Sequence, residues 1–201
     1  MRFSRRDFLQ RSAAVAAGFG GLQTLSAYQS DKNALLTEGY GELQPDPNQI
    51  LELPKGFRYS IISEAGQMMN DGLVVPGKPD GMAAFPGPKG TTILVRNHEI
   101  NPAVTPTVGP FGKDNNKLTD GIRAKLYDPG ERPNLGARVP CLGGTTTLVY
   151  DTQRQRTVQQ FLSLSGTLRN CAGGLTPWGS WITCEETVER AGKVCSLDHG
   201  Y

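Results

Sequence analysis

The sequence predicts an all-β fold, and three observations support this prediction. Glycine (25) and proline (14) make up about a fifth of the 201 residues, and within helices each glycine costs about 1 kcal/mol and each proline about 3 kcal/mol relative to alanine. Short runs of β-branched and aromatic residues are bounded by Gly, Pro, Asn or Asp, as strands are. After residue 27 no run with helical periodicity exceeds two turns. The spacing of the runs is compatible with a β-propeller or a β-sandwich.

Five runs are predicted to be strands, namely 57–62, 92–96, 145–150, 158–164 and 180–184. The third and fourth flank a short polar connector, so we expect them to be antiparallel neighbours. Long segments rich in Gly and Pro, 70–90 and 101–140, are predicted to be loops. Loops of that length inside a compact domain are usually functional or disordered.

The charge of the chain is divided unequally between its N-terminal segment and the rest. Four arginines against one aspartate give residues 1–27 a charge of +3, so residues 28–201 carry −1 of the total of +2. Nucleic-acid binding depends on clustered Lys and Arg, so a near-neutral body predicts no nucleic-acid partner. No stretch of 18 apolar residues is present, so we expect no membrane span in the mature chain.

The N-terminal segment has the features of an export signal. Ser4-Arg5-Arg6-Asp7-Phe8-Leu9 precedes a weakly apolar stretch from Ala13 to Leu25, a pattern typical of twin-arginine signals. An ordinary amphipathic helix is the alternative. We expect the twin-arginine translocase as a partner and a periplasmic or secreted destination. In that oxidising environment the four cysteines, 141, 171, 184 and 195, allow three disulfide pairings. The sequence is compatible with a cleaved or a retained signal.

Three segments concentrate polar residues of the kinds found at metal sites: 80–82, 96–99 and 166–186. In the last, Cys171 lies just before a glycine pair, and a predicted strand ends in Glu185 and Glu186. Adjacent strand residues point to opposite faces, so we expect one glutamate to bind a metal and the other to support the site. Thiolate with carboxylate suits iron, and oxygen ligands alone suit calcium. Taken singly, solvated glutamates and an inert buried cysteine are the simpler alternatives.

Taken together, these segments are similar to a known family. The matching strings are LPKGFRYSIIS (53–63), VPGKPDGMAAF (75–85), LVRNHE (94–99), GPFG (109–112), GGTTTLV (143–149) and SGTLRNCAGGLTPWGSWITCEET (165–187). They resemble the PhoX-type alkaline phosphatases, bacterial proteins exported by the twin-arginine route. The resemblance covers the chain from residue 53 onward. It therefore divides the chain into a signal peptide (1–27), a spacer (28–52) and part of a β-propeller domain (53–201).

The resemblance implies a calcium-activated phosphatase with iron and calcium at its centre, acting on phosphorylated small molecules. It makes Cys171 the thiolate that binds iron and Glu186, with Glu185, the carboxylate ligands. Asn97 and Glu99 are expected to face the catalytic pocket. The mechanism it implies is metal-assisted phosphoryl transfer.

The length of the chain limits how much of a propeller it holds. Propellers need about four or more blades of roughly 40–45 residues, so we expect two to three blades here and a C-terminally truncated family member that is inactive alone. A non-catalytic exported propeller that binds a ligand or a protein is the alternative function, because fold does not fix function.

Overall fold

The structure is a computed structural model, and it describes residues 39–101, 109–132, 137–192 and 195–200. The chain divides into two compact units, Met1–Ser60 and Ile61–Tyr201, which are described separately. The predicted signal peptide, 1–27, lies outside the described residues. No helix among the described residues is long and apolar enough to span a membrane.

The described part of the first unit is organised around one aspartate. Strands β1 (Leu43–Gln44) and β2 (Leu53–Pro54) pair antiparallel. Between them, the carboxylate of Asp46 accepts hydrogen bonds from three backbone N–H groups and, at 2.7 Å, from the Tyr59 hydroxyl. The run 57–62, predicted to be a strand, is not one. Strand propensity reflects fit to a paired, half-buried surface, and no strand in the described part of the chain pairs with this run.

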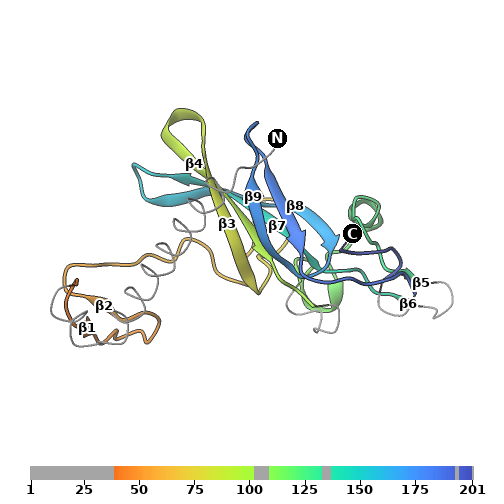
Figure 1. Cartoon of the computed structure of the whole chain (residues 1–201), viewed down its shortest axis with the longest axis horizontal. Coiled ribbons are helices and arrows are strands. Elements are labelled where there is room, and N and C mark those ends of the chain that lie inside the picture. The colour runs from red at the N-terminus through yellow and green to blue at the C-terminus, as the bar shows by residue number, and fades with distance from the viewer. Residues whose placement is uncertain (1–38, 102–108, 133–136, 193–194, 201) are drawn as a thin grey trace, which may run out of the picture. The chain divides into compact units, whose positions relative to one another are not determined.

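The second unit is built on a four-stranded antiparallel sheet in the order β3-β4-β7-β8 (Figure 1). The strands are β3 (Pro79–Pro86), β4 (Thr91–His98), β7 (Gly143–Asp151) and β8 (Arg156–Thr167). Three of them contain the predicted runs 92–96, 145–150 and 158–164, and the last two are antiparallel neighbours as predicted. The all-β prediction is confirmed to this extent.

Strand β3 lies inside the segment 70–90, which the sequence analysis predicted to be a loop. This strand has a proline at each end and Gly81 within it, and both residue types have low strand propensity. The sheet order puts β3 at an edge, where proline is tolerated because its nitrogen need not donate to a neighbouring strand. The prediction of a loop was therefore wrong for 79–86.

A hairpin of β9 (Asn170–Leu175) and β10 (Trp181–Glu185) carries the residues singled out from the sequence. Its turn is closed by Thr176, whose hydroxyl accepts from the Ser180 backbone N–H at 2.9 Å. Strand β9 also contacts β3 and β4 of the large sheet (Figure 1). This contact brings the hairpin against the end of β4, where the second polar segment lies.

The main apolar core lies outside the hairpin and is formed by residues of the connections between strands, with Leu162 of β8 packed against it. Its buried members are Met69, Leu73, Val75, Ile100, Phe111 and Leu142. A smaller buried cluster joins Cys141, Leu168 and Cys195. The remaining short elements are η1 (Pro88–Gly90), η3 (Lys113–Asn115), α3 (Asp120–Arg123), β5 (Glu131–Arg132) and β6 (Ala137–Arg138).

Candidate metal centre

Asn97, near the end of β4, joins the large sheet to the hairpin. Its buried side-chain amide donates from Nδ2 to the backbone oxygens of Cys171 (2.7 Å) and Ala172 (2.9 Å). Its Oδ1 accepts from Trp181 Nε1 (2.9 Å) and from the Thr183 hydroxyl (2.8 Å). Both donors and both lone pairs of the amide are therefore used within the protein, so Asn97 fixes the position of Cys171.

Gly81 allows β9 to lie this close to β3. A Cβ atom built at residue 81 would lie 2.6 Å from the backbone oxygen of Cys171, which is closer than real contacts allow. The first polar segment therefore has a packing role at this position. It places the neighbouring Asp80 beside the cysteine.

The thiol of Cys171 is half-buried and surrounded by acidic groups. Its pKa is raised, first by burial and then by the charges of Asp80, Glu186 and Glu99, and the S–H group also donates a hydrogen bond to the Asp80 carboxylate. Each of these effects disfavours the thiolate. The sulfur atom therefore lies in a region of negative potential.

One cation, Arg169, lies between two of these carboxylates. Its Nε is 3.5 Å from Glu99 Oε1, and its terminal nitrogen is 3.2 Å from Glu186 Oε2. Arg169 has a left-handed backbone with φ of +48°, and its carbonyl accepts from the Glu186 N–H at 2.9 Å. Three carboxylates and one guanidinium leave two negative charges around the thiol.

This donor set fits a bound cation. Carboxylate oxygens are hard ligands and the cysteine sulfur is a soft one, and the excess negative charge is what a cation would neutralise. These donors are not packed tightly around one point. In the described part of the chain, the ligand atoms that lie within 4.8 Å of one another belong to a different group, Asp128, Cys195 and His199. The donors around Cys171 form an open cluster.

Glu185 does not join this cluster. Its Oε1 accepts from His199 Nδ1 and from the Leu168 N–H, both at 2.7 Å, and its Oε2 accepts from the Gly200 N–H at 2.7 Å. Glu186, the next residue, faces Arg169 and Cys171. The structure thus brings Cys171, Glu186 and Glu99 together and turns Glu185, the last residue of β10, away from them.

Two members of the cluster, Asp80 and Arg169, were not among the predicted site residues. Both lie in segments that the sequence analysis marked as unusually polar. Their role depends on the contact of β9 with β3 and on the left-handed turn at residue 169, neither of which a local pattern reveals. Cys184, on β10, is exposed and has no place in the cluster.

Comparison with known proteins gives this cluster its context. No curated protein and no solved structure is significantly similar to the chain. A family model described as alkaline phosphatase PhoX matches residues 38–199, which is most of the chain. The matched range includes Asp80, Glu99, Arg169, Cys171 and Glu186. PhoX is a family of metal-dependent phosphatases, in agreement with a site rich in anionic ligands. The chain belongs to the PhoX alkaline phosphatase family.

Proposed function

We propose that this protein is a phosphomonoesterase whose reaction depends on iron and calcium bound at the Cys171 cluster. The observation that carries the proposal is the arrangement of Asp80, Glu99 and Glu186 around the half-buried thiol of Cys171. Burial and the charges of these carboxylates raise the pKa of the thiol. Concentrated negative charge in a partly desolvated site attracts cations. Membership of the PhoX family supplies the class of reaction.

The two kinds of donor divide between the two metals. The sulfur of Cys171 is the ligand that selects iron, and the oxygens of Glu186 suit either ion. Calcium takes about six to eight oxygen ligands, so the described carboxylates supply part of its coordination shell. When bound, the cations supply positive charge that neutralises the phosphoryl oxygens as the ester bond breaks.

The residues of this chain hold the donors in place. Asn97 positions the Cys171 backbone, and because its amide has no remaining hydrogen-bonding capacity we assign it a positioning role instead of contact with substrate. Arg169 holds Glu99 and Glu186 on either side of its guanidinium. Glu99, which is partly exposed, is the carboxylate that we expect to face the substrate.

The proposal also includes the fold of the protein and its cellular location. A four-stranded antiparallel sheet in sequential order is the unit from which propellers are built, so we assign β3-β4-β7-β8 to one blade. We also propose export by the twin-arginine translocase to the periplasm or beyond, on the basis of Arg5 and Arg6 in the N-terminal segment.

Turnover of a chromogenic phosphate monoester by the full gene product tests the proposal. We expect activity that is lost after treatment with a chelator and restored by iron and calcium together, with Cys171→Ser inactive and Cys184→Ser active. Calcium alone, or no metal, with no turnover would instead support the non-catalytic propeller that binds a ligand or a protein.

A further inference from the structure

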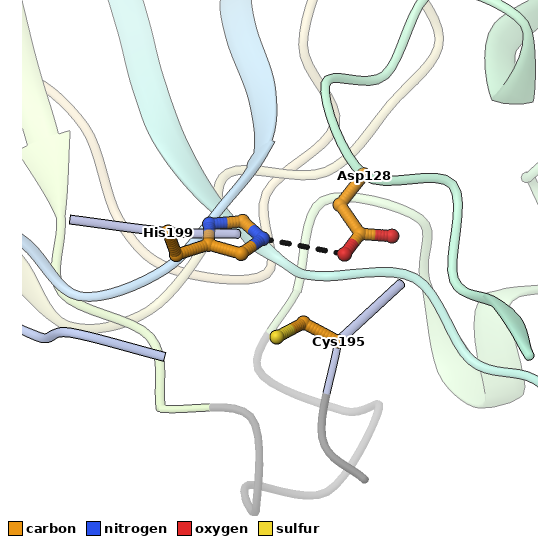
Figure 2. A group of neighbouring side chains, drawn as sticks. All are labelled: Asp128, Cys195 and His199. Atoms are coloured by element: carbon orange, nitrogen blue, oxygen red, sulfur yellow. Dashed lines mark hydrogen bonds and ion pairs between the residues drawn. The ribbon is translucent and has the colours of Figure 1, made fainter. Parts of the chain in front are cut away.

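A second group of ligand-type side chains lies apart from the Cys171 cluster and is wholly buried. One ligand atom from each of Asp128, Cys195 and His199 lies within 4.8 Å of the others (Figure 2). All three residues are at most 1% exposed. Asp128 follows α3, whereas Cys195 and His199 belong to the segment after β10, so the fold brings together positions 67 to 71 residues apart.

The imidazole of His199 is held so that one ring nitrogen faces the group. Its Nδ1 donates to Glu185 Oε1 at 2.7 Å, and a neutral imidazole has only one N–H. Its Nε2 then offers a lone pair, 3.2 Å from Asp128 Oδ2 and 3.8 Å from the sulfur of Cys141. A carboxylate that fixes the far nitrogen of a histidine is the usual support of a metal-binding imidazole.

Asp128 keeps its negative charge in the interior. Its Oδ1 accepts from the Gly130 N–H at 2.7 Å and from the Ser196 hydroxyl, and its Oδ2 accepts from the N–H groups of Ser196 (2.7 Å) and Leu197 (3.0 Å). These four hydrogen bonds stabilise the buried carboxylate in its charged form. The group therefore contains a buried carboxylate opposite a nitrogen lone pair.

Two of the distances in this region match those between ligands of one tetrahedral ion. With zinc bonds of about 2.0–2.3 Å, two ligand atoms of the same ion lie roughly 3.3–3.8 Å apart. The pairs Nε2–Oδ2 at 3.2 Å and Nε2–Sγ of Cys141 at 3.8 Å are within a few tenths of an ångström of that range. A cation between these atoms would replace the contact of His199 with Asp128 and leave the other hydrogen bonds of Asp128 intact.

We propose that Asp128, Cys195 and His199, together with Cys141, whose sulfur lies 3.8 Å from His199 Nε2, form a structural site for a borderline-soft divalent cation. Zinc is the best match. Four protein ligands without an open position are characteristic of structural zinc, and wholly buried side chains leave no route for a substrate. The site ties the segment 195–200 to the Asp128 loop and, through Glu185, to β10. It is independent of the phosphatase proposal, because its ligands are different residues from those of the Cys171 cluster.

Metal binding by the purified chain, kept reduced and treated with a chelator, tests this site. The probes are Zn²⁺ alone, measured by elemental analysis after dialysis, and Co²⁺, whose visible and sulfur charge-transfer bands report tetrahedral thiolate coordination. We expect one tightly bound equivalent in the wild type and in Cys184→Ser. Cys195→Ser and Asp128→Asn should lose the sulfur band or bind at least tenfold more weakly. Glu185→Gln should weaken binding by about 10–100-fold.

Two outcomes of these measurements would overturn the proposal. One is reduced wild-type protein that retains no Zn²⁺ after dialysis and shows no sulfur charge-transfer band with Co²⁺. The other is folded Cys195→Ser that binds Co²⁺ with the wild-type spectrum. If a variant fails to fold, thiol alkylation of the wild type still decides, because zinc should slow modification of Cys141 and Cys195 but leave that of exposed Cys184 unchanged.

Discussion

The side-chain amide of Asn97 donates a 2.7 Å hydrogen bond to the backbone oxygen of Cys171, across 74 positions of sequence. This bond, with the three others that Asn97 makes, fixes the hairpin β9–β10 against β4 and so places the cysteine among its acidic neighbours. The geometry of the Cys171 cluster therefore depends on a residue that has no capacity left to bind a ligand.

Asn97→Ala should destabilise the second unit by about 2–4 kcal/mol, because it leaves two carbonyls and two donors without their partner. Urea unfolding followed by circular dichroism measures this change. Trp181→Phe, which removes one of the four hydrogen bonds of Asn97 together with part of the ring, is the comparison and should cost about 1–2 kcal/mol. Equal losses in the two variants would contradict the central place given to the amide.

Gly81→Ala should move β9 away from β3, because the added Cβ would lie 2.6 Å from the Cys171 oxygen. We expect a destabilisation of about 1–3 kcal/mol, as for other overpacked sites. Gly174→Ala on β9 is the control, since a Cβ there meets nothing within 4 Å. A Gly81→Ala protein as stable as Gly174→Ala would show that the close approach is not required.

Asp80→Asn should lower the pKa of Cys171, because it removes both a negative charge and the strong acceptor of the S–H group. A lower pKa makes the thiol more reactive at a pH below that pKa, because a larger fraction of it is thiolate. The rate of iodoacetamide alkylation against pH, in metal-free protein carrying Cys184→Ser, measures it. Asp114→Asn is the control and should leave the profile unchanged, because Asp114 is not among the charges that raise this pKa. An unchanged profile in Asp80→Asn would contradict the placement of Asp80 beside the thiol.

Protonation of His98 should weaken the fold at mildly acidic pH. Its Nδ1 donates to the Gly77 carbonyl and its Nε2 accepts from the Thr146 hydroxyl, both at 2.9 Å. Burial, helped by the charge of Arg96 and opposed by the bond to Gly77, lowers its pKa from 6.5 to about 4.

The unfolded chain therefore takes up a proton between these two pH values that the folded chain does not. Stability should be unaffected above pH 6.5 and should fall by up to about 3 kcal/mol as the pH drops to 4. Urea unfolding between pH 4 and 7 measures the loss. His98→Gln should flatten this part of the profile, and an identical profile in that variant would remove His98 as its cause.

The strands that the sequence predicted correctly are those whose own residues favour pairing, such as Thr145–Tyr150 and Val158–Leu164. Strands β3 and β9 were missed because Pro79, Pro86, Gly173 and Gly174 disfavour strands locally. Pairing at the edge of the sheet stabilises β3, and contact with the sheet stabilises β9. Conversely, residues 57–62 have strand propensity but no partner strand in the described part of the chain.

The same division applies to the sites. Cys171, Glu186 and Glu99 were predicted as site residues from the sequence, because they lie in polar strings that resemble a known family. Asp80 and Arg169 join them only through the contact of β9 with β3 and a left-handed turn. The group of Asp128, Cys195 and His199 joins segments that share no local pattern. Sequence patterns thus indicate which residues carry chemistry, whereas long-range packing determines which of them meet.

The iron and calcium content of Cys171→Ser, compared with that of Cys184→Ser, tests the central claim most directly. Both cysteines lie on the same hairpin, but only the sulfur at 171 faces the acidic cluster. We expect Cys184→Ser to keep the wild-type iron content and Cys171→Ser to lose most of its iron. Equal iron in the two purified, folded variants would contradict the claim that Cys171 binds it.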